Sequence, residues 1–169
     1  MENAYPQALK LLSIQYFNEY LGKIEAAFER LTEAQVWQRP NEASNSMGNQ
    51  VLHLCGNIRQ YAISSLGQQS DVRVRDAEFA AEGGLSKAEL LEKLKQTVEE
   101  ANAIFEGLDE AELLRKRHVQ AYHYSGFEVL VHVVEHFSYH TGQVVFWAKA
   151  ISNHGFDFYA NVDLNEKGE

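Results

Sequence analysis

The near-absence of proline most constrains what this chain can fold into, because only Pro6 and Pro40 occur among 169 residues. Proline breaks helices by removing a backbone donor and clashing with the preceding turn, so long stretches of this chain are free to be helical. Capping boxes, in which Ser or Thr precedes Glu or Gln by three residues, mark helix starts. They occur at Thr32–Gln35, Ser86–Glu89 and Ser125–Glu128. The sequence therefore predicts a mostly helical protein, with both prolines at helix edges.

Apolar residues recur at helical spacing in four long segments, roughly 4–31, 46–66, 86–107 and 125–152, which predicts four long helices. The third segment has a clear amphipathic stripe. The stripe consists of Leu90, Leu91, Leu94, Val98, Ala101, Phe105 and Leu108.

Two connections between these segments are long. Residues 67–85, between the second and third predicted helices, are too many for a tight bundle loop. We therefore expect this connection to cross over the bundle or to form the rim of a functional site. Residues 108–124 are expected to be irregular. The predicted fold class is all-α, a four-helix bundle with a long crossover connection, in one domain over residues 1–169.

Composition excludes several partners. Fifteen Lys and Arg face 24 Asp and Glu, a net charge of −9, which argues against nucleic acid and anionic membranes. The basic cluster from Lys116 to His118 is too small to change this. No apolar run approaches the ~20 residues of a membrane span, and the N-terminus does not resemble a signal peptide. One Cys cannot close an internal disulfide. We therefore expect a cytoplasmic protein with no membrane contact.

Three histidines recur every four residues in the last predicted helix, at His132, His136 and His140. Each step of four rotates the helix by about 40°, so the three side chains share one stripe. The helix is apolar around most of its circumference, which predicts deep burial. Two histidines one turn apart can bind one metal ion, whereas His132 and His140 lie about 12 Å apart along the axis, too far to share one. The pattern leaves two pairs open, His132 with His136 or His136 with His140.

A two-histidine site needs further ligands, and His53 in the second predicted helix is a candidate. The apolar arc of that helix comprises Val51, Leu54, Cys55, Ile58, Tyr61 and Ala62, and its polar arc comprises Gln50, His53, Asn57 and Gln60. Because His53 lies off the apolar arc, periodicity favours a solvent-facing histidine over one that lines a wet pocket. Cys55 lies on the apolar arc, and we expect it to pack in the core rather than act as a nucleophile.

Two motifs carry a resemblance to a known family. His53-Leu54-Cys55-Gly56-Asn57 lies in the second predicted helix, and His136-Phe137-Ser138-Tyr139-His140-Thr141-Gly142-Gln143 lies in the last, about 80 residues later. Together with the chain length and helix order, they resemble the DinB-like (damage-inducible) superfamily of four-helix bundles across nearly the whole chain. The Asn-Ser-Met-Gly-Asn-Gln opening of the second helix is similar to one uncharacterised branch of that superfamily.

The resemblance implies that His53, His136 and His140 are the metal ligands and that His132 is a neighbour of the site. Three neutral ligands leave an open coordination position, which is typical of catalytic sites. Imidazole suits several divalent metals; zinc or nickel is the first expectation, with iron or copper next. Relatives include transferases and isomerases that use low-molecular-weight thiols, so the resemblance implies a small-molecule substrate, such a thiol as partner, and a homodimer.

Other polar side chains are candidates for supporting roles. Asn57 and Gln143 each lie one turn after a proposed ligand and are hypothesised to orient a substrate or a ligand ring. Glu135 lies to one side of the histidine stripe on the last predicted helix, so it is a poor metal ligand and is considered only as a general base. The remaining histidines, His118, His123 and His154, are expected at the surface. Three tyrosines are expected either to line the mouth of the site or to pack against other aromatic and apolar side chains, namely Tyr122, Tyr124 and Tyr139.

The predicted function is a divalent-metal-dependent enzyme, either a thiol S-transferase or a hydrolase, and the sequence does not choose between them. The alternative is a non-enzymatic metal-binding or stress-response dimeric bundle without turnover. A third hypothesis is a structural dimerisation module with a vestigial site.

Overall fold

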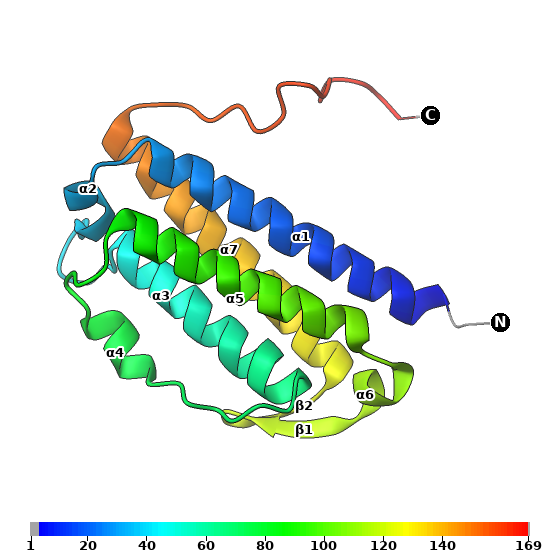
Figure 1. The fold of residues 1–169 in the computed structure, drawn as a ribbon. Coiled ribbons are helices and arrows are strands. Elements are labelled where there is room, and N and C mark those ends of the chain that lie inside the picture. The colour runs from blue at the N-terminus through cyan, green and yellow to red at the C-terminus, as the bar shows by residue number, and fades with distance from the viewer. Residues whose placement is uncertain (1–3, 169) are drawn as a thin grey trace.

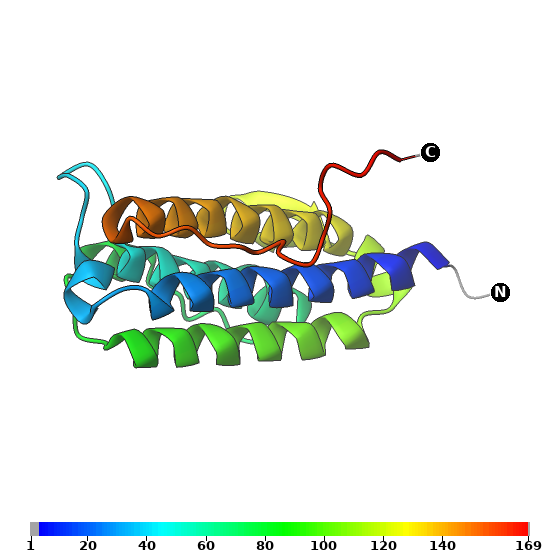
Figure 2. The same ribbon diagram turned by 90° about the horizontal axis from the view of Figure 1, so that it is seen from above.

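A computed structural model describes residues 4–168, and the chain is mostly helical, as predicted (Figure 1). The long helices are α1 (Ala4–Glu29), α3 (Met47–Ile58), α5 (Lys87–Gly107) and α7 (Gly126–Ser152). Both α1 and α3 contact α5 and α7, so the four helices lie side by side, as Figure 1 and Figure 2 show from two directions.

Capping boxes lie at the helix starts that the sequence predicted. The hydroxyls of Thr32, Ser86 and Ser125 cap α2 (Glu33–Trp37), α5 and α7, and Ser46 caps α3 with Asn49 in place of an acid. The predicted helix over 46–66 changes character partway, because the π-helical segment η1 (Arg59–Leu66) follows α3 directly. Wide turns of this kind are frequent at functional sites.

The segment 67–86 runs along the outside of α3 and contains the short helix α4 (Arg75–Ala80). Because α3 and α5 begin at the same end of the molecule, this segment must return the chain to that end (Figure 1). Asn49 Nδ2 donates to the carbonyl oxygens of Glu78, at 2.9 Å, and Ala81, at 2.8 Å. An asparagine buried at the start of α3 thus fixes the path of the returning segment.

The stretch 108–124, expected to be irregular, is structured. It contains α6 (Glu110–Leu114) and an antiparallel pair, β1 (Lys116–Val119) and β2 (Tyr122–Ser125). The buried Arg117 guanidinium holds the hairpin in place by donating to three carbonyl oxygens, those of Ser65, Glu112 and Arg115. The prediction of an irregular connection here is therefore wrong. The segment contains a small hairpin that is held in place by the hydrogen bonds of one buried arginine.

The core is centred on aromatic rings from three helices. Phe17 of α1 packs edge-to-face against Phe105 of α5 and Phe137 of α7, each at 5.2 Å between ring centroids. Such pairs add about 0.5–1.5 kcal/mol beyond the area they bury. Cys55 is buried in the same core, as predicted, and burial raises the pKa of its thiol to about 11.

One prediction about α7 is wrong. The helix is not buried all round, because Val131, Tyr139 and Phe146 are 49%, 59% and 72% exposed. Within residues 4–168, α7 packs against the long helices α1 and α3 and against the shorter elements η1, α6 and β2, and its remaining side keeps apolar side chains in contact with solvent.

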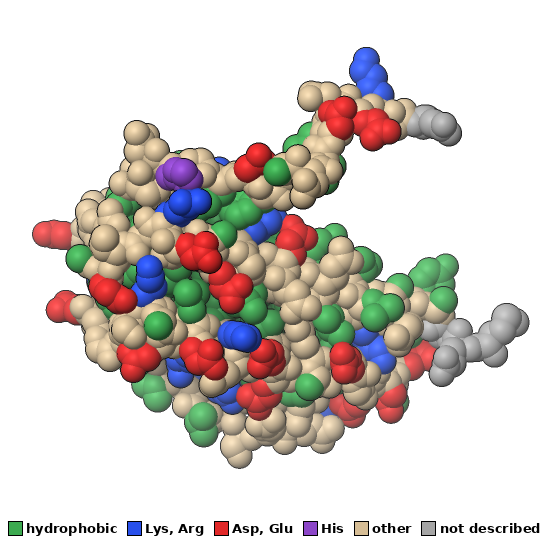
Figure 3. Space-filling model, turned by 45° about the horizontal axis from the view of Figure 1, so that its top comes forward, with side chains coloured by type: hydrophobic (Ala, Val, Ile, Leu, Met, Phe, Trp, Pro, Cys, Tyr) green, Lys and Arg blue, Asp and Glu red, His purple; other side chains and the backbone are tan. Residues whose placement is uncertain are grey.

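The surface fits the acidic composition. On the face drawn in Figure 3, Lys and Arg side chains are scattered among Asp and Glu and form no continuous basic patch. Within residues 4–168, no helix is both long enough and apolar enough to cross a membrane.

Candidate metal centre

Three histidines from two helices converge between α3 and α7. The ring nitrogens of His53, His136 and His140 that face one another all lie within 4.8 Å, and the Nε2 atoms of His53 and His136 are 3.0 Å apart. His53 and His140 are buried and His136 is half-buried. Of the two pairs left open by the helical spacing, the structure therefore joins His136 with His140 and leaves His132 outside the cluster.

The solvent-facing prediction for His53 is wrong, since its residue is only 6% exposed. The polar arc of α3 is covered by α4 and the returning segment, and the Phe79 ring of α4 lies 4.8 Å from the His53 ring. The polar arc is thus the wall of an interior polar site. Periodicity could not reveal this, because α4 is positioned only by the tertiary fold.

Hydrogen bonds on the outer side of the cluster set the proton positions on two rings. His53 Nδ1 lies 2.9 Å from Glu78 Oε2 and His140 Nδ1 lies 2.8 Å from Gln143 Oε1. A carboxylate and an amide oxygen only accept, so these two contacts require the proton on each Nδ1. For His53 the contact with Glu78 is shorter than the 3.2 Å from Nδ1 to Arg73 Nη2, and it favours Nδ1 as the donor. Both Nε2 atoms then present lone pairs, the form in which imidazole binds metals.

The donor set fits a divalent ion. Two ligands of a tetrahedral ion at 2.0–2.1 Å from it are about 3.3 Å apart. The 3.0 Å between the Nε2 atoms of His53 and His136 needs a slight widening, and a pair at the 4.8 Å limit of the cluster needs to close around the ion. Burial, followed by the neighbouring His140, His53 and His132 rings, lowers the pKa of His136 to about 3. Burial likewise lowers the pKa of His140 to about 4. These two rings are therefore neutral imidazoles, with one N–H each, at neutral pH, which is the form that binds metal.

Glu78 and Arg73, both from the returning segment, are the parts of the site that the sequence did not reveal. Arg73 donates from Nε to Glu78 Oε1 at 2.7 Å and from Nη2 to Oε2 at 2.9 Å. Burial disfavours the Glu78 carboxylate, but the hydrogen bonds from Arg73 and His53 outweigh it and lower the pKa of Glu78. An ionised acid thus holds His53, and an arginine holds the acid. The only signal was mixed charge in a segment without periodicity.

Gly56 makes room for this acid. A Cβ built on Gly56 would lie 1.9 Å from Glu78 Oε1 and 2.9 Å from Arg73 Nε. Any larger residue must displace the carboxylate from His53. The glycine three positions after His53 is thereby explained by the ion pair that packs over the helix.

His132 continues the row of rings toward η1. Its ring stacks on His136 at 5.5 Å and lies 4.1 Å from the Tyr61 ring, measured between centroids. Its Nε2 is 3.4 Å from Asn57 Nδ2, and burial lowers its pKa. Asn57 therefore contacts His132 rather than a clustered histidine. The Asn57 Oδ1 atom is buried without a hydrogen-bond partner among the described residues.

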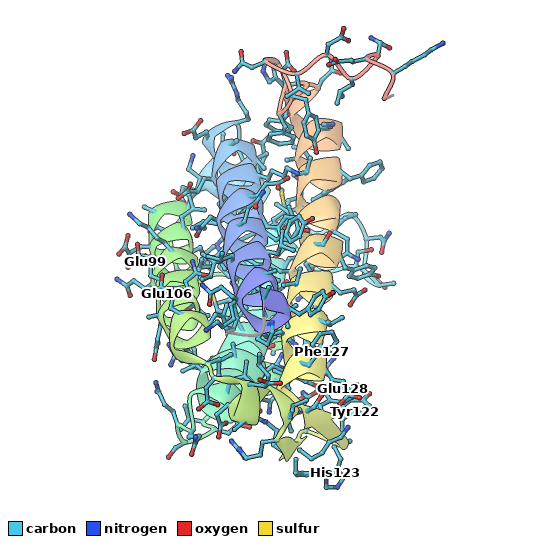
Figure 4. The ribbon with its side chains drawn as sticks, turned by 90° about the vertical axis from the view of Figure 1, so that its right-hand side faces the viewer. Glu99, Glu106, Tyr122, His123, Phe127 and Glu128 are labelled. Atoms are coloured by element: carbon cyan, nitrogen blue, oxygen red, sulfur yellow. The ribbon has the colours of Figure 1, made fainter. Side chains whose placement is uncertain are left out.

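The other candidates lie at the edges. Glu135 is exposed on α7, and the Tyr139 ring lies 5.1 Å from that of His140. Figure 4 shows Tyr122 and His123 on the hairpin at one end of the molecule. As expected, three histidines are exposed outside the cluster, namely His118, His123 and His154.

The fold has solved relatives. A DinB-like protein from Bacillus subtilis is 18% identical, with a TM-score of 0.65 over 86% of this chain and 94% of that one. A DinB family member from Shewanella denitrificans is 16% identical, with a TM-score of 0.63 over 99% of this chain and all of the other. At these identities the likeness shows the fold alone: this chain has the helical fold of these two DinB-like proteins.

The model of a protein family described as "Protein of unknown function (DUF1572)" matches residues 7–161 of this chain. The chain therefore belongs to this family. No curated protein matches the chain.

Proposed function

We propose that His53, His136 and His140 bind one divalent metal ion, zinc or nickel first, and that the protein is a metal-dependent enzyme. The observation that carries the proposal is the convergence of three imidazole nitrogens within 4.8 Å. Three protein ligands leave a coordination position for a substrate. The reaction class proposed is transfer of a low-molecular-weight thiol to an electrophile, or hydrolysis.

The chain's own residues prepare the site for that chemistry. A bound divalent ion would supply a Lewis acid that lowers the pKa of a coordinated thiol or water. Glu78 and Gln143 hold the proton on the outer nitrogen of His53 and His140, at 2.9 and 2.8 Å, which keeps the inner nitrogens free. Supporting groups of this kind fix the orientation and basicity of metal ligands. His132, beside His136, is the nearest further imidazole and is proposed to contact substrate, with Asn57 at its Nε2.

The same proposal extends to the fold, the oligomeric state and the cellular location of the protein. We take the fold to be a four-helix bundle in one domain, with 67–86 as its crossover, acting as a homodimer in the cytoplasm. The side-by-side packing of α1, α3, α5 and α7 supports the bundle, and the exposed apolar side chains of α7 support self-association.

Metal analysis tests the site. Protein purified without a histidine tag and incubated with zinc or nickel, then desalted, should retain about one ion per chain. His53→Ala, His136→Ala and His140→Ala should each lose it, whereas His154→Ala, an exposed histidine outside the cluster, should not. Retention in all three cluster variants would overturn the assignment.

Turnover tests the enzyme. The metal-loaded protein should accelerate the reaction of a small thiol with an electrophile such as 1-chloro-2,4-dinitrobenzene, or the hydrolysis of an activated amide or ester, and His140→Ala should abolish the acceleration. A protein that binds metal but accelerates neither reaction would be the alternative, a non-enzymatic metal-binding bundle. A protein that binds no metal would leave only the structural dimerisation module.

A further inference from the structure

Two exposed histidines face each other across the hairpin formed by β1 and β2. His118 of β1 is paired with His123 of β2 in the antiparallel register. Side chains paired in this way lie on the same face of the sheet, with Cβ atoms about 4.5–5.5 Å apart. Both residues are exposed, and their ring centroids lie 4.9 Å apart. Figure 4 shows His123 at the end of the molecule that the hairpin forms. A solute can therefore reach both rings at once.

The spacing of the two rings is that of two imidazoles on one metal ion. With each nitrogen about 2.0–2.1 Å from the ion and an angle of about 90–109° between them, the ring centroids are about 4.5–5.2 Å apart. The 4.9 Å between His118 and His123 falls in this range. So do the 4.5, 4.9 and 5.0 Å among the rings of the three clustered histidines. Among residues 4–168, neither hairpin ring makes a side-chain hydrogen bond, so its nitrogens are free to bind an ion.

The surroundings of the pair tolerate a positive ion and separate it from the candidate metal centre. Lys116 precedes His118 by two residues and therefore shares its strand face, but the charge of Lys116 is paired, because its Nζ lies 2.8 Å from Glu128 Oε2. Tyr124 lies on the opposite face of β2, and its ring centroid is 6.2 Å from that of His132. The pair thus faces outward while the other face of the hairpin turns toward the cluster.

The hairpin holds the pair in place before any ion binds. The buried guanidinium of Arg117 donates to the carbonyl oxygen of Ser65 at 3.1 Å. In the turn between the strands, Gln120 Oε1 accepts a hydrogen bond from Tyr61 Oη at 2.6 Å. Both contacts fasten the hairpin to η1. Because an ion would not have to order the strands, little of its binding free energy is lost to ordering.

We propose that His118 and His123 form a second metal site, which binds a divalent transition metal ion and prefers copper. Imidazole binds several such ions, and copper binds most tightly among the first-row divalent metals. The pair supplies two ligands, and water or a small external ligand completes the coordination. Two ligands hold an ion more weakly than three, so desalting should remove this ion and leave the one bound by the cluster. The inference does not rest on the proposed function, because the pair lies outside the cluster.

Immobilised copper tests the pair without involving the cluster. A copper ion chelated on a resin can reach exposed imidazoles, whereas the clustered histidines are buried or half-buried. The untagged protein should be retained. His118→Ala and His123→Ala should each bind the resin at least about tenfold more weakly, because the second imidazole of the pair acts at a high effective concentration. His154→Ala, which removes an exposed histidine outside the pair, should elute like the wild type.

Free copper tests the site in solution. In ¹H–¹³C NMR spectra of the full chain, first loaded with zinc, each histidine ring gives its own signals, which the same variants assign. Substoichiometric Cu²⁺ is paramagnetic and should broaden the ring signals of His118 and His123 before those of His154. A cluster that takes up no zinc would contradict the proposed function, and the two hairpin signals would still report on the second site.

A swap of neighbouring residues tests the facing geometry. Tyr122→His combined with His123→Tyr keeps the number of histidines but moves one imidazole to the other face of β2, because side chains alternate along a strand. The swapped protein, with folding checked by circular dichroism, should bind copper as weakly as His123→Ala. The proposal is overturned if the swapped protein or either single variant binds copper as tightly as the wild type. It is equally overturned if the His154 ring broadens first.

Discussion

At the scale of single residues, the geometry of the three-histidine cluster depends on groups that lie behind the histidine rings, away from the nitrogens that face one another. His53 would be one imidazole on a polar helix face without Glu78, whose carboxylate fixes its proton and ring position. Arg73 in turn holds both carboxylate oxygens, at 2.7 and 2.9 Å. A buried acid between a histidine and an arginine is thus the residue on which ligand geometry depends most.

Replacing Glu78 with Gln should therefore weaken metal binding more than it weakens folding. Loss of such a supporting group costs metal affinity about 10–100-fold, measured by competition with a chromophoric chelator. Glu99→Gln, on the outward face of α5 (Figure 4), is the control and should bind like the wild type. Equal affinities for Glu78→Gln and Glu99→Gln would show that Glu78 has no positioning role.

The histidines also predict how the metal-free protein responds to acid. Unfolded imidazoles titrate near 6.5, whereas burial lowers the pKa to about 3 for His136 and about 4 for His140. Between these values the unfolded chain binds more protons, so the free energy of unfolding falls as the pH drops from about 6.5 to about 4. Urea midpoints should show this fall, and His136→Gln should reduce it. A fall of the same size in wild type and variant would contradict the assignment; His154→Gln should leave it unchanged.

At the scale of elements, the long helices follow from local signals and the returning segment does not. Three capping boxes in the sequence place the starts of α2, α5 and α7, and apolar periodicity predicts the long helices, while the box at Ser46 and Asn49 that begins α3 is seen only in the structure. The segment 67–86 has no periodicity, because its path is set by tertiary hydrogen bonds from Asn49 and Trp37 and by the ion pair between Arg73 and Glu78 within the segment. The hairpin was missed because its strands are only four residues long and rest on the buried side chain of Arg117.

Gly56 tests how closely α3 and the returning segment must fit. Gly56→Ala would place a Cβ where Glu78 Oε1 now lies, and the flexible acid can move away, so metal affinity should fall about 10–100-fold while the protein still folds. Gly22→Ala in α1 is the matched control, because nothing lies within 4 Å of its added methyl group. It should leave metal binding unchanged and raise the free energy of unfolding by about 0.5–1 kcal/mol. Wild-type affinity in Gly56→Ala would contradict the fit.

At the scale of the whole molecule, the apolar core on one side of α7 supports a polar site on another. The spacing of His132, His136 and His140 was enough to predict a shared stripe and to exclude one ion bridging the first and last. It could not place His53, since only the covering α4 makes that polar arc interior. Glu78 was beyond prediction for the same reason. Residues that act through contacts between distant segments leave no periodic signal.

Phe17 connects three helices of the core, because its ring on α1 packs against aromatic rings of α5 and α7. Phe17→Ala should lower the free energy of unfolding by about 3–5 kcal/mol, through lost burial and the cavity left behind. Leu12→Ala, at a 47% exposed position of the same helix, should change it by no more than about 0.5 kcal/mol. Urea unfolding followed by circular dichroism measures both, and similar losses in the two variants would contradict this core.

The central claim is that three histidines bind one metal, and X-ray absorption on the cobalt-loaded protein tests it most directly. The account predicts about one ion per chain with three imidazole ligands and no sulfur, because Cys55 is buried in the core away from the cluster. His53→Ala should reduce the imidazole count to two. A spectrum with sulfur, or one with the same imidazole count in His53→Ala as in the wild type, would contradict the account.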